Sequence, residues 1–198
     1  MSHASDYGIT INDPKVDFPG MINRSRGVAD GMSKGVTFLM KKNKIDVIMG
    51  EGKVKTGKKI DVTDKDGKTT TYEADNIIIS TGARAKELPN VKVDGKKIIE
   101  YRKAMTMEKQ PKKMVVMGSG AIGCEFAYFY NAIGTEVTIV EYLDNIIPRE
   151  DEEVSKQLAR TFKKNGIKIM TSAAVESVDT CILYTSDAAD EENNINPR

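Results

Sequence analysis

A glycine-rich segment at residues 118–123, with the sequence GSGAIG, has the residue types and spacing that hold a nucleotide phosphate. Gly118 permits a tight turn, Gly120 lets the backbone approach a pyrophosphate, and Gly123 lets a helix pack on a strand. The free N–H groups and partial positive charge at a helix N-terminus also attract phosphate. The segment therefore predicts a dinucleotide-binding turn. The alternative interpretation is a glycine-rich strand-to-helix turn with no ligand.

An acidic residue follows this segment at the expected distance. Glu141 lies 141 − 123 = 18 positions after Gly123, close to the roughly 20 residues that separate the fingerprint from a ribose-binding acid. A carboxylate accepts hydrogen bonds from both hydroxyls of an adenine ribose, and it repels a 2′-phosphate. The sequence therefore predicts binding of NAD(H) rather than NADP(H).

The elements that must position these residues can be predicted from the pattern of apolar residues. Met114–Met117 is a short apolar run typical of a buried parallel strand. Cys124–Ile133 has helical spacing, Gly134 ends it, and Glu136–Val140 alternates like a second strand that ends beside Glu141.

The same alternation of helix and strand continues beyond the acid. Asp151–Asn165 predicts an amphipathic helix with Val154, Leu158 and Phe162 on one side, and Ile167–Met170 predicts the next strand. Strands that alternate with helices in this way indicate an α/β fold with a parallel sheet.

The first half of the chain has a different pattern. Met21–Asn43 predicts a long helix, and Ile45–Met49 predicts a strand. Lys59–Thr63 and Thr69–Tyr72 flank an Asp-Gly turn and predict a hairpin. Asn76–Ser80 is predicted to be a further, fully apolar strand.

Composition excludes several classes of protein. The chain has 198 residues, 39% of them hydrophobic and 30% charged, with a net charge of +1, so it generates no general field for nucleic acid or a membrane surface. No apolar run reaches the roughly 18 residues of a membrane span, and we expect a cytoplasmic protein. Cys124 and Cys181 suggest neither a disulfide framework nor a metal site, and His3 is the only histidine. We expect Cys124 to be a packed thiol whose burial outweighs the helix dipole.

Two segments in this order resemble a known family. Residues 77–89, IIISTGARAKELP, resemble the strand and turn that close the FAD domain of flavoprotein pyridine nucleotide-disulfide oxidoreductases. Residues 117–127, MGSGAIGCEFA, resemble the NAD-domain fingerprint of the same family. Glu141 with Ile147 and Pro148 continues the match and is similar to the dihydrolipoamide dehydrogenase branch, whereas NADP-linked glutathione reductases place basic residues there. The resemblance covers roughly residues 2–179.

The resemblance implies an α/β fragment of a flavoprotein with two dinucleotide-binding domains. Residues 1–90 would form the C-terminal part of the FAD-binding domain, which is incomplete and carries an antiparallel hairpin insert. Residues 91–180 would form a truncated, Rossmann-like NAD-binding domain. Residues 181–198 resemble the translation of a sequencing-library adapter, the alternative being a genuine polar tail.

The resemblance also assigns cofactor-binding positions, whereas no catalytic or metal-ligating residue is predicted. The NAD-binding positions would be Gly118, Ser119, Gly120, Ala121, Ile122, Gly123, Cys124, Glu125, Glu141 and Val175. The FAD-facing positions would be Gly52, Ser80, Thr81 and Gly82. Glu125 would lie near the junction of flavin and nicotinamide.

The activity implied is transfer of electrons from dihydrolipoamide, through a disulfide and FAD, to NAD. The partners implied are dihydrolipoamide on an acyl-transfer complex and a second subunit in a homodimer, with no nucleic acid and no membrane. We expect the chain to be an internal fragment without the family's redox cysteine pair and His–Glu pair, and therefore inactive alone. The alternatives are a non-catalytic nucleotide-binding module and another NAD-linked disulfide reductase, similar to mercuric reductase.

Overall fold

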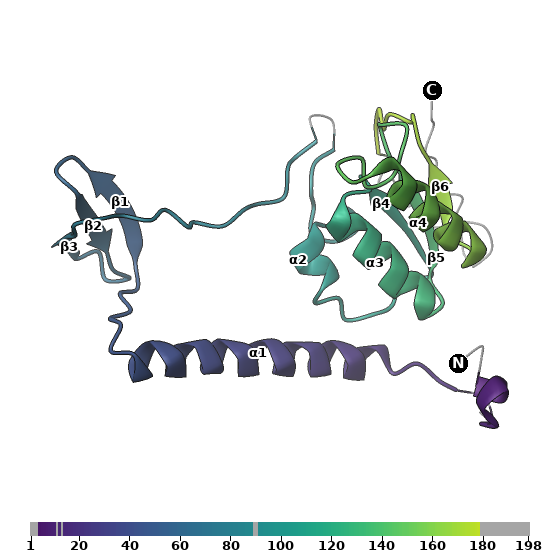
Figure 1. Ribbon diagram of the computed structural model, residues 1–198, viewed down its shortest axis with the longest axis horizontal. Coiled ribbons are helices and arrows are strands. Elements are labelled where there is room, and N and C mark those ends of the chain that lie inside the picture. Colours follow the sequence, from purple (N-terminus) through teal and green to yellow (C-terminus); the bar gives the residue numbers. More distant parts are fainter. Residues whose placement is uncertain (1–3, 11, 13, 89–90, 179–198) are drawn as a thin grey trace. The chain divides into compact units, whose positions relative to one another are not determined.

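The computed structural model describes residues 4–10, 12, 14–88 and 91–178, which fall into two compact units (Figure 1). Unit 1 contains the described residues up to Ile22 and those from Ala85 onward, and unit 2 is Asn23–Arg84. The long helix α1, Phe18–Lys42, contributes to both units. A short 3₁₀ helix, Ala4–Tyr7, precedes it. The predicted tail at 181–198 lies outside the described residues.

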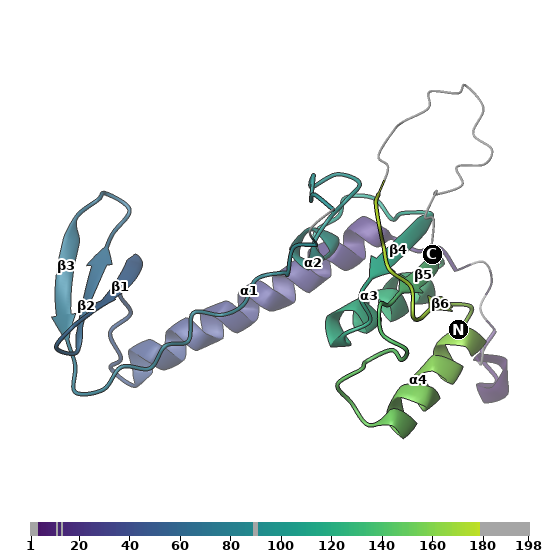
Figure 2. The ribbon, with the colours of Figure 1, turned by 90° about the horizontal axis from the view of Figure 1, so that it is seen from above.

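Unit 1 is built on a parallel sheet in the order β4-β5-β6. The sheet strands are β4 (Lys113–Met117), β5 (Glu136–Val140) and β6 (Lys168–Met170). The crossover helices are α3 (Ala121–Ala132) and α4 (Glu152–Lys164), and a short helix, α2 (Tyr101–Ala104), precedes β4. Figure 2 shows this strand–helix alternation from above. The predicted parallel α/β pattern is confirmed.

The core of unit 1 lies between the sheet and its helices. Val137 and Ile139 of β5 are fully buried, as is Tyr130 of α3. The Tyr130 ring contacts Phe18 of α1, with ring centroids 6.0 Å apart, and its hydroxyl donates a hydrogen bond to the Ala104 carbonyl at 2.6 Å. The polar end of a large buried side chain is thereby satisfied.

The side of α4 that carries Val154, Leu158 and Phe162 is not buried along its whole length. Leu158 is half-buried and Phe162 is buried, but Val154 is 55% exposed. Ser155 takes the buried position instead, because its hydroxyl donates to the Ile146 carbonyl. Apolar spacing alone does not reveal a serine that is satisfied in this way.

Unit 2 contains most of α1 and an antiparallel sheet in the order β1-β2-β3. Its strands are β1 (Glu51–Lys55), β2 (Lys59–Thr63) and β3 (Thr69–Glu73), which confirms the predicted Asp-Gly hairpin. The strand predicted at Ile45–Met49 is wrong, because β1 starts at Glu51, where the hairpin register pairs Glu51 with Thr63.

The strand predicted at Asn76–Ser80 is also wrong, since this segment pairs with no strand in the described chain. Ile78 is 90% exposed and Ile79 is 69% exposed. An apolar sequence indicates that a segment needs burial, whereas a strand needs a hydrogen-bonded neighbour, which the described residues do not provide.

Polar pairs rather than a core hold the hairpin sheet together. Asp61 accepts a hydrogen bond from the Thr71 hydroxyl at 2.7 Å and forms an ion pair with Lys55 at 3.3 Å. Lys59 and Glu73 form a second ion pair at 2.7 Å. Such cross-strand pairs each contribute up to about 1 kcal/mol.

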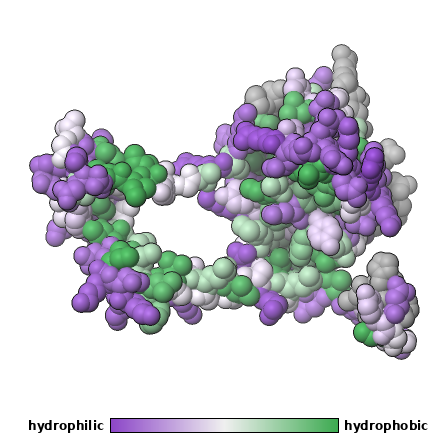
Figure 3. Space-filling view, viewed as in Figure 1, coloured by the Kyte–Doolittle hydropathy of each residue, from purple (hydrophilic) through white to green (hydrophobic). Residues whose placement is uncertain are grey.

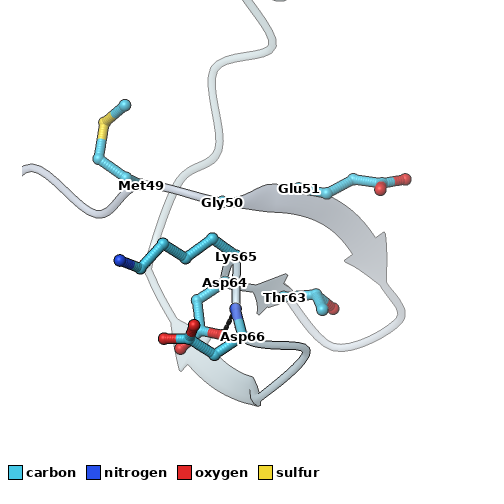
Figure 4. Close-up of a pocket in the computed structure, with 7 residues that line it drawn as sticks. All are labelled: Met49, Gly50, Glu51, Thr63, Asp64, Lys65 and Asp66. Atoms are coloured by element: carbon cyan, nitrogen blue, oxygen red, sulfur yellow. Dashed lines mark hydrogen bonds between the residues drawn. The ribbon is translucent and has the colours of Figure 1, made fainter.

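A hollow of about 500 Å³ opens beside the β2–β3 turn (Figure 4). The Asp64 carboxylate closes this turn by accepting hydrogen bonds from the Asp66 and Lys68 N–H groups. The residues that line the hollow are Met49, Gly50, Glu51, Thr63, Asp64, Lys65 and Asp66. None of the predicted nucleotide-binding residues is among them.

No helix in the described part of the chain is both long enough and apolar enough to cross a membrane.

Candidate dinucleotide-binding site

The three fingerprint glycines lie between β4 and α3, and the fold requires only two of them. Gly118 has φ of 93°, a conformation that favours glycine, and its N–H donates to the Val140 carbonyl at 2.8 Å. A Cβ added to Gly123 would lie 2.3 Å from the Gly118 carbonyl oxygen, so only glycine fits there. A Cβ on Gly120 would meet no described atom within 4 Å. Packing within the chain therefore does not account for Gly120, and the open space would let a phosphate approach the backbone closely.

The N-terminus of α3 offers hydrogen-bond donors at this turn. Gly120 is the N-cap residue, and no side chain in the described part of the chain caps the helix. Cys124 donates the first backbone bond of the helix, to the Gly120 carbonyl at 3.0 Å. The N–H groups of the preceding first turn have no acceptor within a helix and are available to an anion.

Glu141 follows β5 directly and points back to the fingerprint. Its side chain belongs to a residue that is only 7% exposed. Oε2 accepts a hydrogen bond from the Ser119 N–H at 2.7 Å and another from the Ser119 hydroxyl at 2.6 Å. Oε1 accepts from the Leu143 N–H at 2.9 Å. The structure therefore brings together the two predicted parts of the site, which are 22 residues apart in sequence between Ser119 and Glu141.

These contacts keep the Glu141 carboxyl ionised. Burial is the largest single influence and raises its pKa, but the hydrogen bonds from Leu143 and Ser119 together outweigh burial, so the pKa lies below its ordinary value. A charged acceptor is thus present beside the fingerprint at neutral pH.

Ser119 is the residue that fixes the turn. It is fully buried, and its carbonyl accepts hydrogen bonds from the Ile147 N–H at 2.9 Å and the Cys124 thiol at 3.3 Å. Ile147 has φ of 42°, which is unusual for a β-branched residue. The loop after Glu141 is therefore held against the fingerprint in a strained conformation.

Cys124 is a packed thiol, as predicted. It is 5% exposed, and burial, with a smaller contribution from the negative charge of Glu141, raises its pKa to about 11. The thiolate, which is the reactive form of cysteine, is therefore scarce at neutral pH.

The other predicted positions lie around this centre or elsewhere. Ala121, Ile122 and Glu125 are exposed at the start of α3, and Val175 is half-buried after β6. Gly52, in β1, belongs to unit 2. The remaining FAD-facing positions, Ser80, Thr81 and Gly82, are exposed in the same unit.

Sequence reasoning missed the partners of the acid. The hydroxyl of Ser119 and the N–H of Leu143 both bind Glu141, and neither contact was predicted. The serine at a position of the fingerprint that does not require glycine was the available signal, since a buried hydroxyl needs a partner. Among the described residues, no group of three or more His, Cys, Asp or Glu side chains could hold a metal ion.

Comparisons with known proteins find similar chains over most of this sequence. The dihydrolipoyl dehydrogenase of Zymomonas mobilis is 46% identical over 178 residues, which are 90% of this chain and 38% of that protein. The dihydrolipoyl dehydrogenase of Rhizobium etli is 41% identical over 194 residues, covering 90% of this chain and 40% of that protein. The crystal structure of LpdA from Mycobacterium tuberculosis aligns with a TM-score of 0.80 and 28% identity, covering 89% of this chain and 39% of that one.

The chain thus spans less than half the length of each of these relatives. A family model described as pyridine nucleotide-disulphide oxidoreductase matches residues 5–192. This match, together with the glycine fingerprint and its contact with Glu141, shows that the chain belongs to the pyridine nucleotide-disulphide oxidoreductase family.

Proposed function

We propose that the chain is part of an FAD-dependent, NAD-linked disulfide oxidoreductase of the dihydrolipoyl dehydrogenase type, and that its residues 91–180, which lie in unit 1, belong to the NAD-binding domain. The observation that carries this proposal is the pairing of Gly120, at the open N-terminus of α3, with an ionised Glu141. The relatives that match about 90% of the chain are named dihydrolipoyl dehydrogenases, which supports this enzyme type.

The residues of unit 1 fit NAD. The N–H groups of Ala121 and Ile122 in the first turn of α3 would bind the pyrophosphate, and Glu141 would accept hydrogen bonds from the adenine ribose. Cys124 would contribute its backbone, and Glu125 and Val175 would border the nicotinamide and adenine sides. NAD supplies the hydride acceptor when it is bound, while this chain orients it and selects it against NADP.

Unit 2 would belong to the FAD-binding domain, but it does not enclose a flavin by itself. Gly52, Ser80, Thr81 and Gly82 are all exposed in unit 2. We therefore assign FAD to these positions only as part of the proposed enzyme.

The proposed substrate and partners follow from the same enzyme type. Dihydrolipoamide on an acyl-transfer complex would supply the electrons, and the enzyme would be a homodimer. A second candidate is favoured by one observation: Cys124 is buried with a raised pKa, and the only other cysteine of the chain is Cys181. The 198-residue chain alone would then be a nucleotide-binding module without turnover, and a dihydrolipoamide–NAD assay with added FAD should give only background.

Titration of the full chain with NADH and NADPH tests the proposed function. Glu141→Gln removes the charge at the ribose position, while Glu136→Gln makes the same change at the other end of β5, where Glu136 pairs with Lys168 at 2.6 Å. Hydrogen bonds to a charged group contribute about 1.5–3 kcal/mol, so Glu141→Gln should weaken NADH binding roughly tenfold or more. It should also reduce the difference between the affinities for NADH and NADPH. Glu136→Gln should leave both affinities unchanged. Equal binding of NADH and NADPH by the unmodified chain would contradict the assignment.

A further inference from the structure

The Glu141 carboxylate has too few free acceptor positions for both hydroxyls of a ribose. A carboxylate offers about four lone-pair positions, two on each oxygen. Both positions on Oε2 are taken by Ser119, one by its N–H and one by its hydroxyl, and Leu143 N–H takes one position on Oε1. The Tyr142 N–H also acts on the carboxylate and lowers its pKa. At most one position therefore remains, whereas a 2′,3′-diol brings two donors.

Only one of the three bound donors can leave without moving the backbone. The Ser119 N–H is fixed, because the carbonyl of the same residue is held by the Ile147 N–H and the Cys124 thiol. The Leu143 N–H belongs to the loop that those contacts anchor. The Ser119 hydroxyl, by contrast, needs only rotation about a single side-chain bond to leave Glu141, although it is fully buried and must then find another acceptor.

We propose that the Ser119 hydroxyl occupies, in the nucleotide-free site, the acceptor position on Glu141 that a ribose hydroxyl takes in the complex. Ser119 is then a built-in competitor that sets the affinity for the adenine ribose. Binding exchanges one hydroxyl for another at this position, so the second ribose hydrogen bond adds little net affinity. This inference rests on the proposed NAD-binding function of unit 1.

Removal of the competing hydroxyl should strengthen the binding of a nucleotide with an intact diol. We expect Ser119→Ala to bind NADH about three- to tenfold more tightly in titrations of the full chain. Ser119→Cys keeps a side chain of similar size but replaces the hydroxyl with a weak donor, so this variant should also bind NADH more tightly than the unmodified chain. An NADH analogue with a 2′-deoxy adenine ribose should bind the unmodified chain, Ser119→Ala and Ser119→Cys with equal affinity. Its single hydroxyl can bind Oε1 and does not need the position that Ser119 occupies.

Two controls separate competition from a general change in structure. Ser155 is buried and donates to the Ile146 carbonyl without touching Glu141, so Ser155→Ala should leave NADH affinity unchanged. In a Glu141→Gln background, Ser119→Ala should have no further effect beyond twofold. Circular dichroism of each variant checks that the fold is retained, and if Ser119→Ala fails this check, Ser119→Cys decides the outcome.

A measurement without ligand tests the contact itself. The Glu141 carboxyl carbon, identified in NMR spectra by its loss in Glu141→Gln, should titrate at a higher pH in Ser119→Ala, because the charged form loses a hydrogen bond, and should be unaffected by Ser155→Ala. If the unmodified chain binds NADH but Ser119→Ala binds it equally or more weakly, the competitor role is wrong and the proposed function stands. If no form binds NADH while the Glu141 titration shifts as expected, the contact stands and the proposed function is wrong. An unchanged titration in Ser119→Ala overturns the inference in either case.

Discussion

Unit 1 and unit 2 differ in what holds them together. Every buried hydrophobic side chain among the described residues belongs to unit 1. Unit 2 instead exposes large apolar side chains, and Figure 3 shows hydrophobic groups on its surface. The exposed set from unit 2 comprises Val28, Met32, Val36, Phe38, Leu39, Ile45, Val47, Ile48, Met49, Val54, Tyr72, Ile78 and Ile79.

The difference shows what sequence-local folding can supply. In unit 1 the helices α3 and α4 alternate along the chain with the strands that they cover, so the elements from β4 to β6 bury one another within a continuous stretch of chain. In unit 2 the helix and the apolar segments around the hairpin have no such cover among the described residues. Polar pairs hold the hairpin register, but they contribute little compared with a buried core.

The largest expected effect comes from removing an aromatic ring in each unit. Tyr130→Ala should destabilise unit 1 by about 3–5 kcal/mol, because the side chain is fully buried and its hydroxyl binds Ala104. Phe38 in α1 is 64% exposed, so Phe38→Ala should change stability by no more than about 0.5 kcal/mol. Urea unfolding of both variants makes the comparison. A large effect of Phe38→Ala would show that unit 2 has a core of its own.

A smaller change in stability, opposite in sign between the units, is expected when one glycine in each unit is replaced by alanine. Gly123→Ala should cost about 1–3 kcal/mol, because its Cβ would lie 2.3 Å from the Gly118 carbonyl oxygen. Gly31→Ala in α1 should stabilise the helix by about 1 kcal/mol, since no described atom lies within 4 Å of its added Cβ. Helicity and thermal unfolding of the two variants check the signs. If Gly31→Ala destabilises the chain, then α1 is packed against a neighbour at that position.

The two units can also be distinguished by alkaline pH. Burial raises the pKa of Cys124 from an ordinary value of 9.0 to about 11, so the neutral thiol is favoured in folded unit 1. Its contribution to stability is present below pH 9.0 and is lost as the pH rises to about 11, while the unfolded thiol ionises. Burial also raises the pKa of Tyr130, so the thiol must be isolated by comparison with a variant.

Cys124→Ala, made in a Cys181→Ser background that leaves no other thiol, should flatten the decline in the free energy of unfolding between pH 9.0 and about 11. A decline of the same size in both proteins would exclude Cys124 as its source. The effect should be absent from the melting of the hairpin sheet in unit 2, which contains no cysteine.

The sequence predicted the parts of the fold whose causes are local. The βαβ pattern from Met114 to Met170, the Asp-Gly hairpin and the position of Glu141 at the end of the second strand follow from spacing and turn chemistry. The strands predicted at Ile45–Met49 and Asn76–Ser80 are not formed, because strand pairing depends on partners elsewhere in the fold. The Ser119 contact with Glu141 was missed because it joins residues that only the parallel register of β4 and β5 brings together.

Hydrogen–deuterium exchange of the full chain, with and without NADH, tests whether unit 1 is a stable core that carries the nucleotide site while unit 2 lacks a core. The backbone amides of β4, α3, β5 and α4 should exchange slowly, whereas the amides of residues 43–84 should exchange quickly. A protease should likewise cut the chain first within residues 43–84. Addition of NADH should slow exchange at residues 118–125 and 141–143 and leave 23–84 unchanged. Equal protection of both units would contradict the difference in their stability. Protection by NADH that does not include residues 118–125 would contradict the proposed nucleotide site.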